Sequence, residues 1–169
     1  MQLLAGQIVS LIALAICLVA FASKRDDRLL RLLISANVAF TLQYLLFESW
    51  VAAAVTTLVI LRIVLARRHP GSYPLMGGVL AATLAVSLLF WEGWLDLLPL
   101  TAGMLGTIGM FMLRGIPMRL MLAGAALAWA LTSLAIGAVG GTVAETLILV
   151  TNLITIARMV RDRRAHSTA

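Results

Sequence analysis

Residues 140–164 read GGTVAETLILVTNLITIARMVRDRR, an apolar segment that opens on a glycine pair and ends in a basic run. Its apolar part carries an acid, Glu145, and an amide, Asn152. They stand seven residues apart, which at ~1.5 Å per residue is about 10 Å along one helical face. Because ionisable groups inside hydrocarbon are costly, they usually point into a bundle or a wet cavity. The segment therefore predicts a membrane helix with a candidate site, although it does not identify the ligand.

The composition of the whole chain indicates an integral membrane protein. Of its 169 residues, 62% are hydrophobic and only 12% are charged, and the mean hydropathy is +1.05. A soluble domain needs more polar surface than this. At roughly 20 apolar residues per span, the chain has room for about seven helices in a single membrane domain over residues 1–169. Its one cysteine, Cys17, excludes an internal disulfide and a multi-thiol metal site.

Apolar runs separated by turn-forming residues predict an all-α fold with seven transmembrane helices. The first run, residues 3–22, is followed rather than preceded by Lys24 and Arg25, which favours a retained span over a cleaved signal. The stretches HPGSYP (69–74) and RGIP (114–117) interrupt the helical pattern with proline. The other runs are residues 29–47, 50–66, 75–91, 95–112, 117–136 and 141–160.

The basic residues all fall on one side of this seven-span arrangement. They are Lys24, Arg25, Arg28, Arg31, Arg62, Arg67, Arg68, Arg114, Arg119, Arg158, Arg161, Arg163 and Arg164. The opposite side has Glu48, Glu92 and Asp96. The positive-inside rule then predicts an external N-terminus and a cytoplasmic C-terminus. We expect Arg62 and Arg158 to extend to the cytoplasmic headgroups, and the basic tail to be an anchor rather than a nucleic-acid site.

The third and seventh spans end alike. RIVLARR (62–68) matches RMVRDRR (158–164), and the same offset pairs Thr56 with Asn152. A second, nearly equal offset relates the first span to the fifth. Chance similarity between apolar helices with basic ends is the alternative to an internal duplication.

A duplication predicts two parallel three-helix repeats, residues 1–68 and 97–164, joined by a linker helix at residues 75–91. In this 3+1+3 arrangement the repeats are related by an axis along the membrane normal. Transporters built from such repeats bind substrate near the bilayer midplane, between the halves.

Three stretches resemble the YgjV-type inner-membrane protein family. The first is the KRDDR loop (24–28), and the second is the run from residue 97 to the end of the seventh span. The third, the most specific, lies within that run: the GAVGGT turn (137–142) followed by Glu145 and Asn152. This resemblance covers most of the chain. It implies a multi-pass protein of the bacterial inner (plasma) membrane with a periplasmic N-terminus, and it implies no activity.

The 3+1+3 layout more distantly resembles the SWEET and PQ-loop transporters, which pair prolines in the first helix of each triplet and asparagines in the third. In this chain Pro99 would be the hinge of the fifth span, while the first span has no proline. Asn152 matches the asparagine of the seventh span, and Thr56 stands at the equivalent place in the third. Half of each signature is present, so sugar specificity is not implied.

Polar residues inside the spans are the candidate site. Glu145 is interpreted as a proton or cation site, with a carboxylate reaching the outer headgroups as the alternative. Asn152 either binds a polar solute or bonds across helices. Trp129 lies mid-span, as a pocket wall or as ordinary packing. A polar stripe on the second span comprises Asn37, Thr41, Tyr44 and Glu48, and Gln7 and Ser10 lie one turn apart on the first. The predicted substrate- or ion-binding residues are Glu145, Asn152, Trp129, Asn37, Gln7 and Thr56.

We therefore predict a small-solute transporter or permease-like protein with a site between the two triplets. Its partners would be the lipid bilayer and a small polar solute, without nucleic acid. The sequence contains no Ser-His-acid set, metal-ligand spacing or phosphate-binding loop, so we expect neither an enzyme nor a bound metal or cofactor. The alternative is a non-transporting structural or assembly protein of the membrane, whose polar stripes hold helices together. Substrate, coupling ion, direction and assembly, homo-oligomers included, are not determined.

Overall fold

The computed structural model describes the backbone of residues 2–22 and 26–167 and the side chains of residues 3–19, 32, 34–66 and 68–161. Over this part of the chain the fold is all-helical, as predicted, with seven α-helices and one short 3₁₀ turn. The elements are α1 (Gln2–Ala22), α2 (Asp26–Leu46), α3 (Trp50–Arg68), α4 (Tyr73–Leu89), η1 (Trp94–Asp96), α5 (Leu97–Met112), α6 (Ile116–Ala135) and α7 (Val139–Ser167). Seven of the thirteen basic side chains used above for topology lie outside the described side chains: Lys24, Arg25, Arg28, Arg31, Arg67, Arg163 and Arg164.

Turn chemistry sets the helix boundaries. Pro74 and Pro117 occupy the first turns of α4 and α6, where the missing N–H would have no helical partner in any case. Gly71 adopts φ 79° in the α3–α4 turn, a left-handed conformation that a side chain would oppose. Its amide donates a hydrogen bond of 3.0 Å to the carbonyl of Phe111, which ties this turn to the end of α5.

Three of the described helical segments are long and apolar enough to cross a membrane. They are Trp94–Met112, Ile116–Ala135 and Val139–Arg161. The remaining four apolar helices are shorter over the described residues: Leu3–Val19, Ile34–Leu46, Trp50–Ala66 and Tyr73–Leu89.

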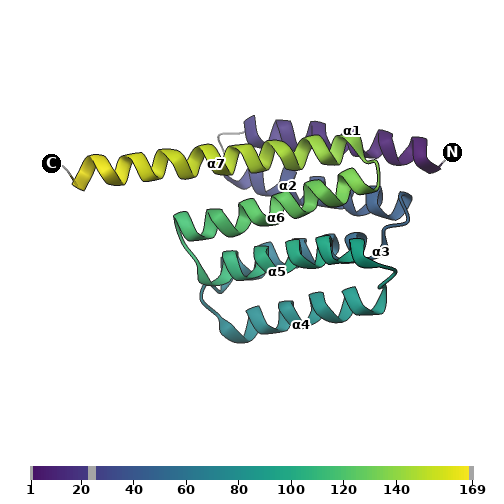
Figure 1. Ribbon diagram of the computed structural model, residues 1–169, viewed down its shortest axis with the longest axis horizontal. Coiled ribbons are helices and arrows are strands. Elements are labelled where there is room, and N and C mark those ends of the chain that lie inside the picture. Colours follow the sequence, from purple (N-terminus) through teal and green to yellow (C-terminus); the bar gives the residue numbers. More distant parts are fainter. Residues whose placement is uncertain (1, 23–25, 168–169) are drawn as a thin grey trace.

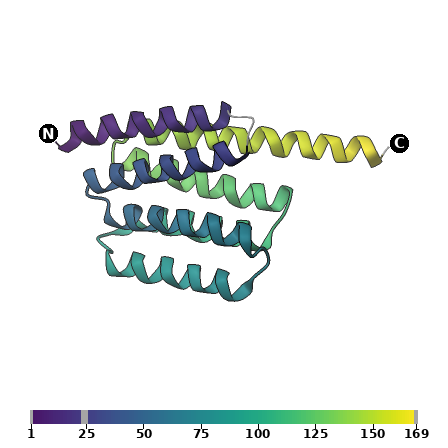
Figure 2. The same ribbon diagram turned by 180° about the vertical axis from the view of Figure 1, so that it is seen from behind.

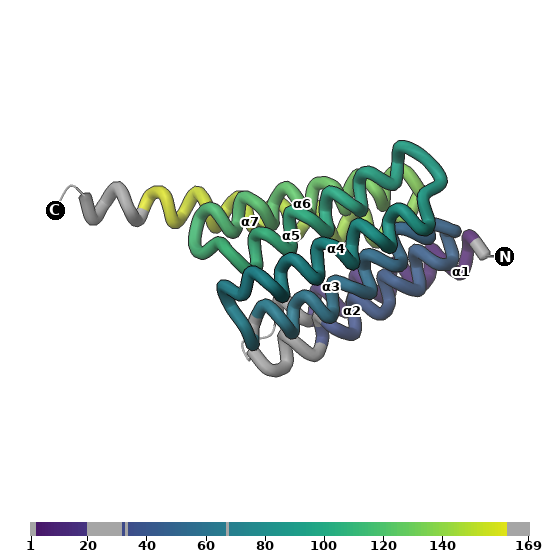
Figure 3. The backbone as a smooth tube through the Cα atoms, turned by 90° about the horizontal axis from the view of Figure 1, so that it is seen from below, coloured from purple at the N-terminus to yellow at the C-terminus, as the bar shows by residue number. Residues whose placement is uncertain are grey.

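The helices lie side by side in two rows (Figure 1). One row consists of α1, α2 and α3, and the other of α7, α6 and α5, as the view from behind also shows (Figure 2). The helix α1 packs against α7 at one end of the rows, and α3 packs against α5 at the other. The helix α4 lies outside both rows, in contact with α3 and α5, and is nearest the viewer in Figure 3. The C-terminal part of α7 extends beyond the bundle.

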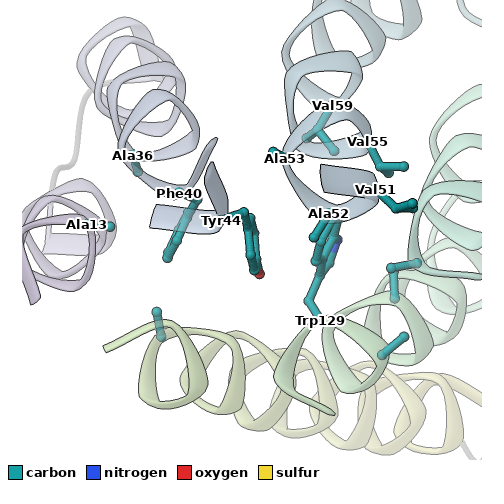
Figure 4. Close-up of a cluster of buried hydrophobic side chains, with 14 of the residues drawn as sticks. Ala13, Ala36, Phe40, Tyr44, Val51, Ala52, Ala53, Val55, Val59 and Trp129 are labelled. Atoms are coloured by element: carbon teal, nitrogen blue, oxygen red, sulfur yellow. The ribbon is translucent and has the colours of Figure 1, made fainter. Parts of the chain in front are cut away.

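The apolar core joins the two rows and consists largely of small side chains. Ala13 of α1, Ala36 of α2, Ala52 of α3 and Ala128 of α6 are all buried in one cluster. Figure 4 shows that the aromatic residues of this cluster point from opposite rows towards the middle. Small residues let helices approach closely, which is how membrane bundles gain van der Waals contact.

The backbones of the two rows approach closely where α7 begins. A Cβ atom on Gly140 would collide with the backbone and side chain of Ser10 on α1. The amide of the next residue, Gly141, donates a 2.9 Å hydrogen bond to the Ser10 hydroxyl. Glycine at position 140 is therefore required for α1 and α7 to meet.

We predict that Gly140→Ala separates α1 from α7 and lowers the free energy of unfolding by roughly 1–3 kcal/mol, as expected for an overpacked contact. The matched control is Gly78→Ala on α4, where an added Cβ meets nothing within 4 Å. It should be neutral or slightly stabilising, because alanine favours the helix over glycine. Thermal unfolding of the purified variants in detergent measures both effects. Equal midpoints for the two variants would show that the α1–α7 contact is not tight.

Candidate functional site

The arginine at position 62 lies inside the bundle. Its side chain is 7% exposed, and Nη1 donates a hydrogen bond of 3.2 Å to the carbonyl of Gly103 on α5. The guanidinium lies against the backbone of Gly106, where a Cβ atom would collide with it. The expectation that Arg62 reaches the cytoplasmic headgroups is therefore wrong.

The reason is the direction in which helical side chains lean. They point back towards the helix N-terminus, and the Arg62 side chain does so along α3. Val55, seven residues earlier on α3, lies against the same Gly103. The guanidinium thus turns towards the start of α3, and the glycines of α5 leave it space. Arg158 is exposed on α7 and shows no such burial.

The carboxylate of Glu145 faces the opposite row of helices. It is half-buried on α7, and it interacts electrostatically with Arg62 of α3, Tyr44 of α2 and Cys17 of α1. Among the described residues, Glu145 and Arg62 do not form an ion pair or a hydrogen bond with each other. A guanidinium and a carboxyl group therefore lie in the bundle without a direct salt bridge between them.

An aromatic pair bridges the middle helices of the two rows. The rings of Tyr44 on α2 and Trp129 on α6 stack with centroids 5.5 Å apart and an angle of 29° between their planes (Figure 4). The Tyr44 hydroxyl lies 3.0 Å from that of Ser133, also on α6, at hydrogen-bonding distance. Trp129 is 7% exposed, so its side chain is packed inside the bundle and does not belong to an aromatic belt at the membrane interface.

Gln43 is a candidate site residue that the sequence did not reveal. It is fully buried, yet neither atom of its amide has a hydrogen-bond partner in the described part of the chain. The amide lies beside Gly141 of α7 and the hydroxyl of Ser133 of α6. In the sequence, Gln43 is marked only as a polar residue next to Tyr44. Helical spacing left it out, because it lies one position away from the polar stripe of the second span.

The predicted stripe on the second span is only partly a single inward face. Tyr44 is buried, and Asn37 and Thr41 are half-buried on α2. Glu48 does not belong to this face, because α2 ends at Leu46 and Glu48 is exposed in the following turn with φ 58°. The helical spacing that grouped Glu48 with Asn37 does not apply after Leu46, where α2 ends.

Polar residues of α1 fasten this helix to the start of α7. The Gln7 amide nitrogen donates to the carbonyl of Gly137, and its oxygen accepts a 3.2 Å hydrogen bond from the amide of Val139. The Ser10 hydroxyl accepts the hydrogen bond from the amide of Gly141. The structure therefore places Gln7 at the α6–α7 turn and away from Arg62.

Two further predicted site residues bond to their own helices. The Thr56 hydroxyl donates 2.7 Å to the carbonyl of Ala52, and the Asn152 amide donates 3.1 Å to that of Ile148. Both side chains are buried. Pro99 is buried in the first turn of α5, where proline interrupts no helical hydrogen bond, so its hinge role stays a prediction.

A cavity of about 470 Å³ opens between the rows at the end of the bundle where the α2–α3 and α4–α5 turns lie. Its lining is Phe47, Glu48, Ser49, Glu92, Gly93, Trp94, Leu95, Asp96 and Ile136. We call this cavity the acidic mouth. One acid is already engaged, because Asp96 Oδ2 accepts the amide protons of Glu92 and Gly93 at 2.8 and 3.0 Å. Among the described residues, no cluster of three or more His, Cys, Asp or Glu could hold a metal ion.

Comparison with known protein families gives a match over most of the chain. The model of the Imp-YgjV family, described as bacterial inner membrane protein, matches residues 4–163. No curated protein and no solved structure matches the chain. The match spans all seven helices and supports a multi-pass protein of the bacterial inner membrane.

We predict that Tyr44→Phe lowers the free energy of unfolding by about 1 kcal/mol, because it removes one buried interhelical hydrogen bond and leaves the Ser133 hydroxyl without its partner. The stack on Trp129 remains. Tyr73→Phe is the control, since Tyr73 is 72% exposed. Unfolding of both variants in detergent, followed by tryptophan fluorescence, provides the comparison. A loss as large for Tyr73→Phe as for Tyr44→Phe would contradict a role for the buried hydroxyl.

Proposed function

Because the chain belongs to the Imp-YgjV family of bacterial inner membrane proteins, we propose that it carries a small polar solute across that membrane, through a site between its two helix rows. The observation that carries the proposal is the buried arginine. The Nε atom of Arg62 has no hydrogen-bond partner among the described residues, and the same is true of both amide atoms of Gln43. Unsatisfied polar groups in an apolar interior are costly, and in membrane proteins such groups usually serve a substrate or ion pathway.

The arrangement of the helices supports two repeats of the 3+1+3 type. Exchanging α1, α2 and α3 with α5, α6 and α7 leaves the packed pairs among these six helices unchanged, since the α1–α7 contact becomes the α5–α3 contact. The helix α4 lies outside both rows, as a linker would.

The hydrogen bonds of two matched residues are also equivalent. Thr56 donates to Ala52 and Asn152 to Ile148, and one sequence offset relates both pairs. These are the residues that the SWEET-like pattern pairs, so they support a shared layout with those transporters. The cleft between repeats is where such transporters bind substrate.

The rival proposal is a structural or assembly protein, and a different set of contacts favours it. Gln7 and Ser10 are both used to hold α1 against the start of α7. A protein that only needed rigid helix packing would use its polar residues in this way. Arg62 and Gln43 do not fit that pattern, because such fasteners would be fully paired.

We predict that the N-terminus is periplasmic and the C-terminus cytoplasmic, as the distribution of basic residues requires. A cytoplasm-dependent fluorescent protein fused after Ala169 should be bright, and a phosphatase that needs export should be inactive at the same position. The reverse pattern would overturn the orientation and the odd number of spans together.

We also predict saturable uptake of at least one class of small solute by proteoliposomes that contain the protein. Neutral, anionic, cationic and zwitterionic solutes should be compared with protein-free liposomes. Glu145→Gln should reduce that uptake by about tenfold or more, because it removes a charge from the interior of the bundle. Arg114→Gln is the control, since Arg114 is an exposed charge at the α5–α6 turn and its removal should leave transport normal. A folded protein that takes up none of these classes would contradict the transport proposal and favour the structural role.

A further inference from the structure

We propose that a groove on the surface of α3 binds one phospholipid with an ammonium headgroup, taken from the leaflet at the end of the bundle where α3 begins. The acyl chain lies along α3, and the ammonium group binds the carboxylate of Glu92. The observation behind this assignment is that apolar, aromatic and acidic residues follow one another along two adjoining hollows. The lipid site does not depend on the transport proposal.

The first step concerns the shape of this groove. The helix α3 lies between α2 and α4 and packs against both (Figure 3). One hollow of about 320 Å³ is lined by Thr41, Leu45, Trp50, Ala53, Ala54, Thr57 and Phe90. A second, of about 490 Å³, is lined by Trp50, Leu89, Phe90, Trp91 and Glu92. The two hollows share Trp50 and Phe90, so they adjoin, and we call them together the α3 groove.

The first hollow is apolar although two threonines line it. The Thr41 hydroxyl donates 3.0 Å to the carbonyl of Asn37, and the Thr57 hydroxyl donates 3.0 Å to that of Ala53. A hydroxyl satisfied within its own helix has little affinity for a polar ligand. From Trp50 to Thr57 the hollow follows the apolar helix α3 for seven residues, or about 10 Å. An apolar channel that runs along a membrane helix suits an acyl chain.

The second hollow changes from aromatic to acidic. Trp50 and Trp91 are 44% and 37% exposed, as is typical of indole rings at the level of the lipid headgroups. An indole N–H can donate a hydrogen bond to a phosphate oxygen. Beside them Glu92 is exposed in the α4–α5 turn, and its carboxylate has no ion pair or hydrogen bond with a described residue. The groove therefore presents its chemistry in the order of the parts of a phospholipid.

Charge complementarity selects the headgroup. None of the described residues that line the α3 groove is basic, and Glu92 also lines the acidic mouth together with Glu48 and Asp96. Carboxylates near the membrane surface attract an ammonium group and repel a headgroup with a net negative charge. A phospholipid with an ammonium headgroup therefore binds through both its charge and its chain, whereas an anionic phospholipid loses the interaction with Glu92.

The test measures lipid binding to the full-length protein in detergent. The probes are phosphatidylethanolamine and phosphatidylglycerol with identical acyl chains, so that the two lipids share the phosphate and differ in the ammonium group. Native mass spectrometry of the delipidated protein counts the bound lipids during each titration. We expect one saturable phosphatidylethanolamine per chain, bound about tenfold more tightly than phosphatidylglycerol, since the ammonium group adds a charged hydrogen bond to Glu92.

A pair of variants assigns the headgroup. Glu92→Gln should remove the preference, so that both lipids bind with similar affinity, because the glutamine has the same shape and no charge. Glu48→Gln is the comparison, since Glu48 is an exposed acid that lines the acidic mouth and not the α3 groove. It should retain the preference for phosphatidylethanolamine. An equal loss in both variants would contradict the assignment of the ammonium group to Glu92.

A second pair of variants assigns the acyl chain. Ala54→Leu fills the first hollow and should weaken both lipids by about fivefold or more, because the chain can no longer lie against α3. The matched control is Ala85→Leu, the same change at an exposed position of α4 outside the α3 groove. Thr57→Leu fills the same hollow from an exposed position and replaces Ala54→Leu if that variant is not monodisperse in size-exclusion chromatography.

The remaining outcomes decide what covers the groove. Binding that rises without saturation, or equal affinity for the two lipids, shows only ordinary bilayer lipid and overturns the site. A preference that survives Glu92→Gln overturns it as well. A dimer that Ala54→Leu converts into a monomer would show that a second copy of the chain occupies the groove instead of a lipid. None of these results depends on solute uptake, so the lipid site and the transport proposal can fail separately.

Discussion

At both ends of the two helix rows, glycine removes a side chain from the contact between them. Gly140 lets α7 lie against the backbone of α1 at Ser10, and Gly106 lets α5 lie against the guanidinium of Arg62. These two contacts join the rows at their opposite ends. A methyl group at position 140 would push α1 and α7 apart, and one at position 106 would displace the guanidinium of Arg62. In a bilayer, where lipid tails are as apolar as the helices, such close packing supplies much of the association energy.

Polar residues inside the spans fall into two classes, and the distinction decides where a site can be. Most of the threonine hydroxyls donate to the carbonyl four residues earlier in the same helix, as Thr83, Thr107 and Thr132 do at 2.7–2.9 Å. A hydroxyl satisfied in this way costs little in hydrocarbon and has little affinity to offer a solute. Arg62 and Gln43 belong to the second class, because buried atoms of each lack partners among the described residues. A count of polar residues per helix would have given both classes equal weight.

The bundle therefore uses its polar side chains differently at different levels. At the start of α7, the side chains of Gln7 and Ser10 form hydrogen bonds that hold α1 against α7 and the α6–α7 turn. Elsewhere in the interior, buried atoms of Arg62 and Gln43 have no hydrogen-bond partner among the described residues, and the rings of Tyr44 and Trp129 stack. Polar side chains are thus fully paired at one level of the bundle and retain unused hydrogen-bonding capacity at another.

The sequence by itself determined the membrane class, the helix count and most helix boundaries. The run predicted at residues 117–136 is α6, Ile116–Ala135, and the run at 50–66 lies within α3, Trp50–Arg68. These features follow from hydropathy, proline and glycine, which act over a few residues of chain. Only the tertiary structure decided the direction of the Arg62 side chain, the burial of Gln43 and the use of Gln7 as a fastener. Each depends on a partner far away in sequence, such as Gly103 and Gly106 for Arg62 or Gly137 for Gln7. Local sequence patterns carry no information about which stretch of backbone packs opposite a given side chain.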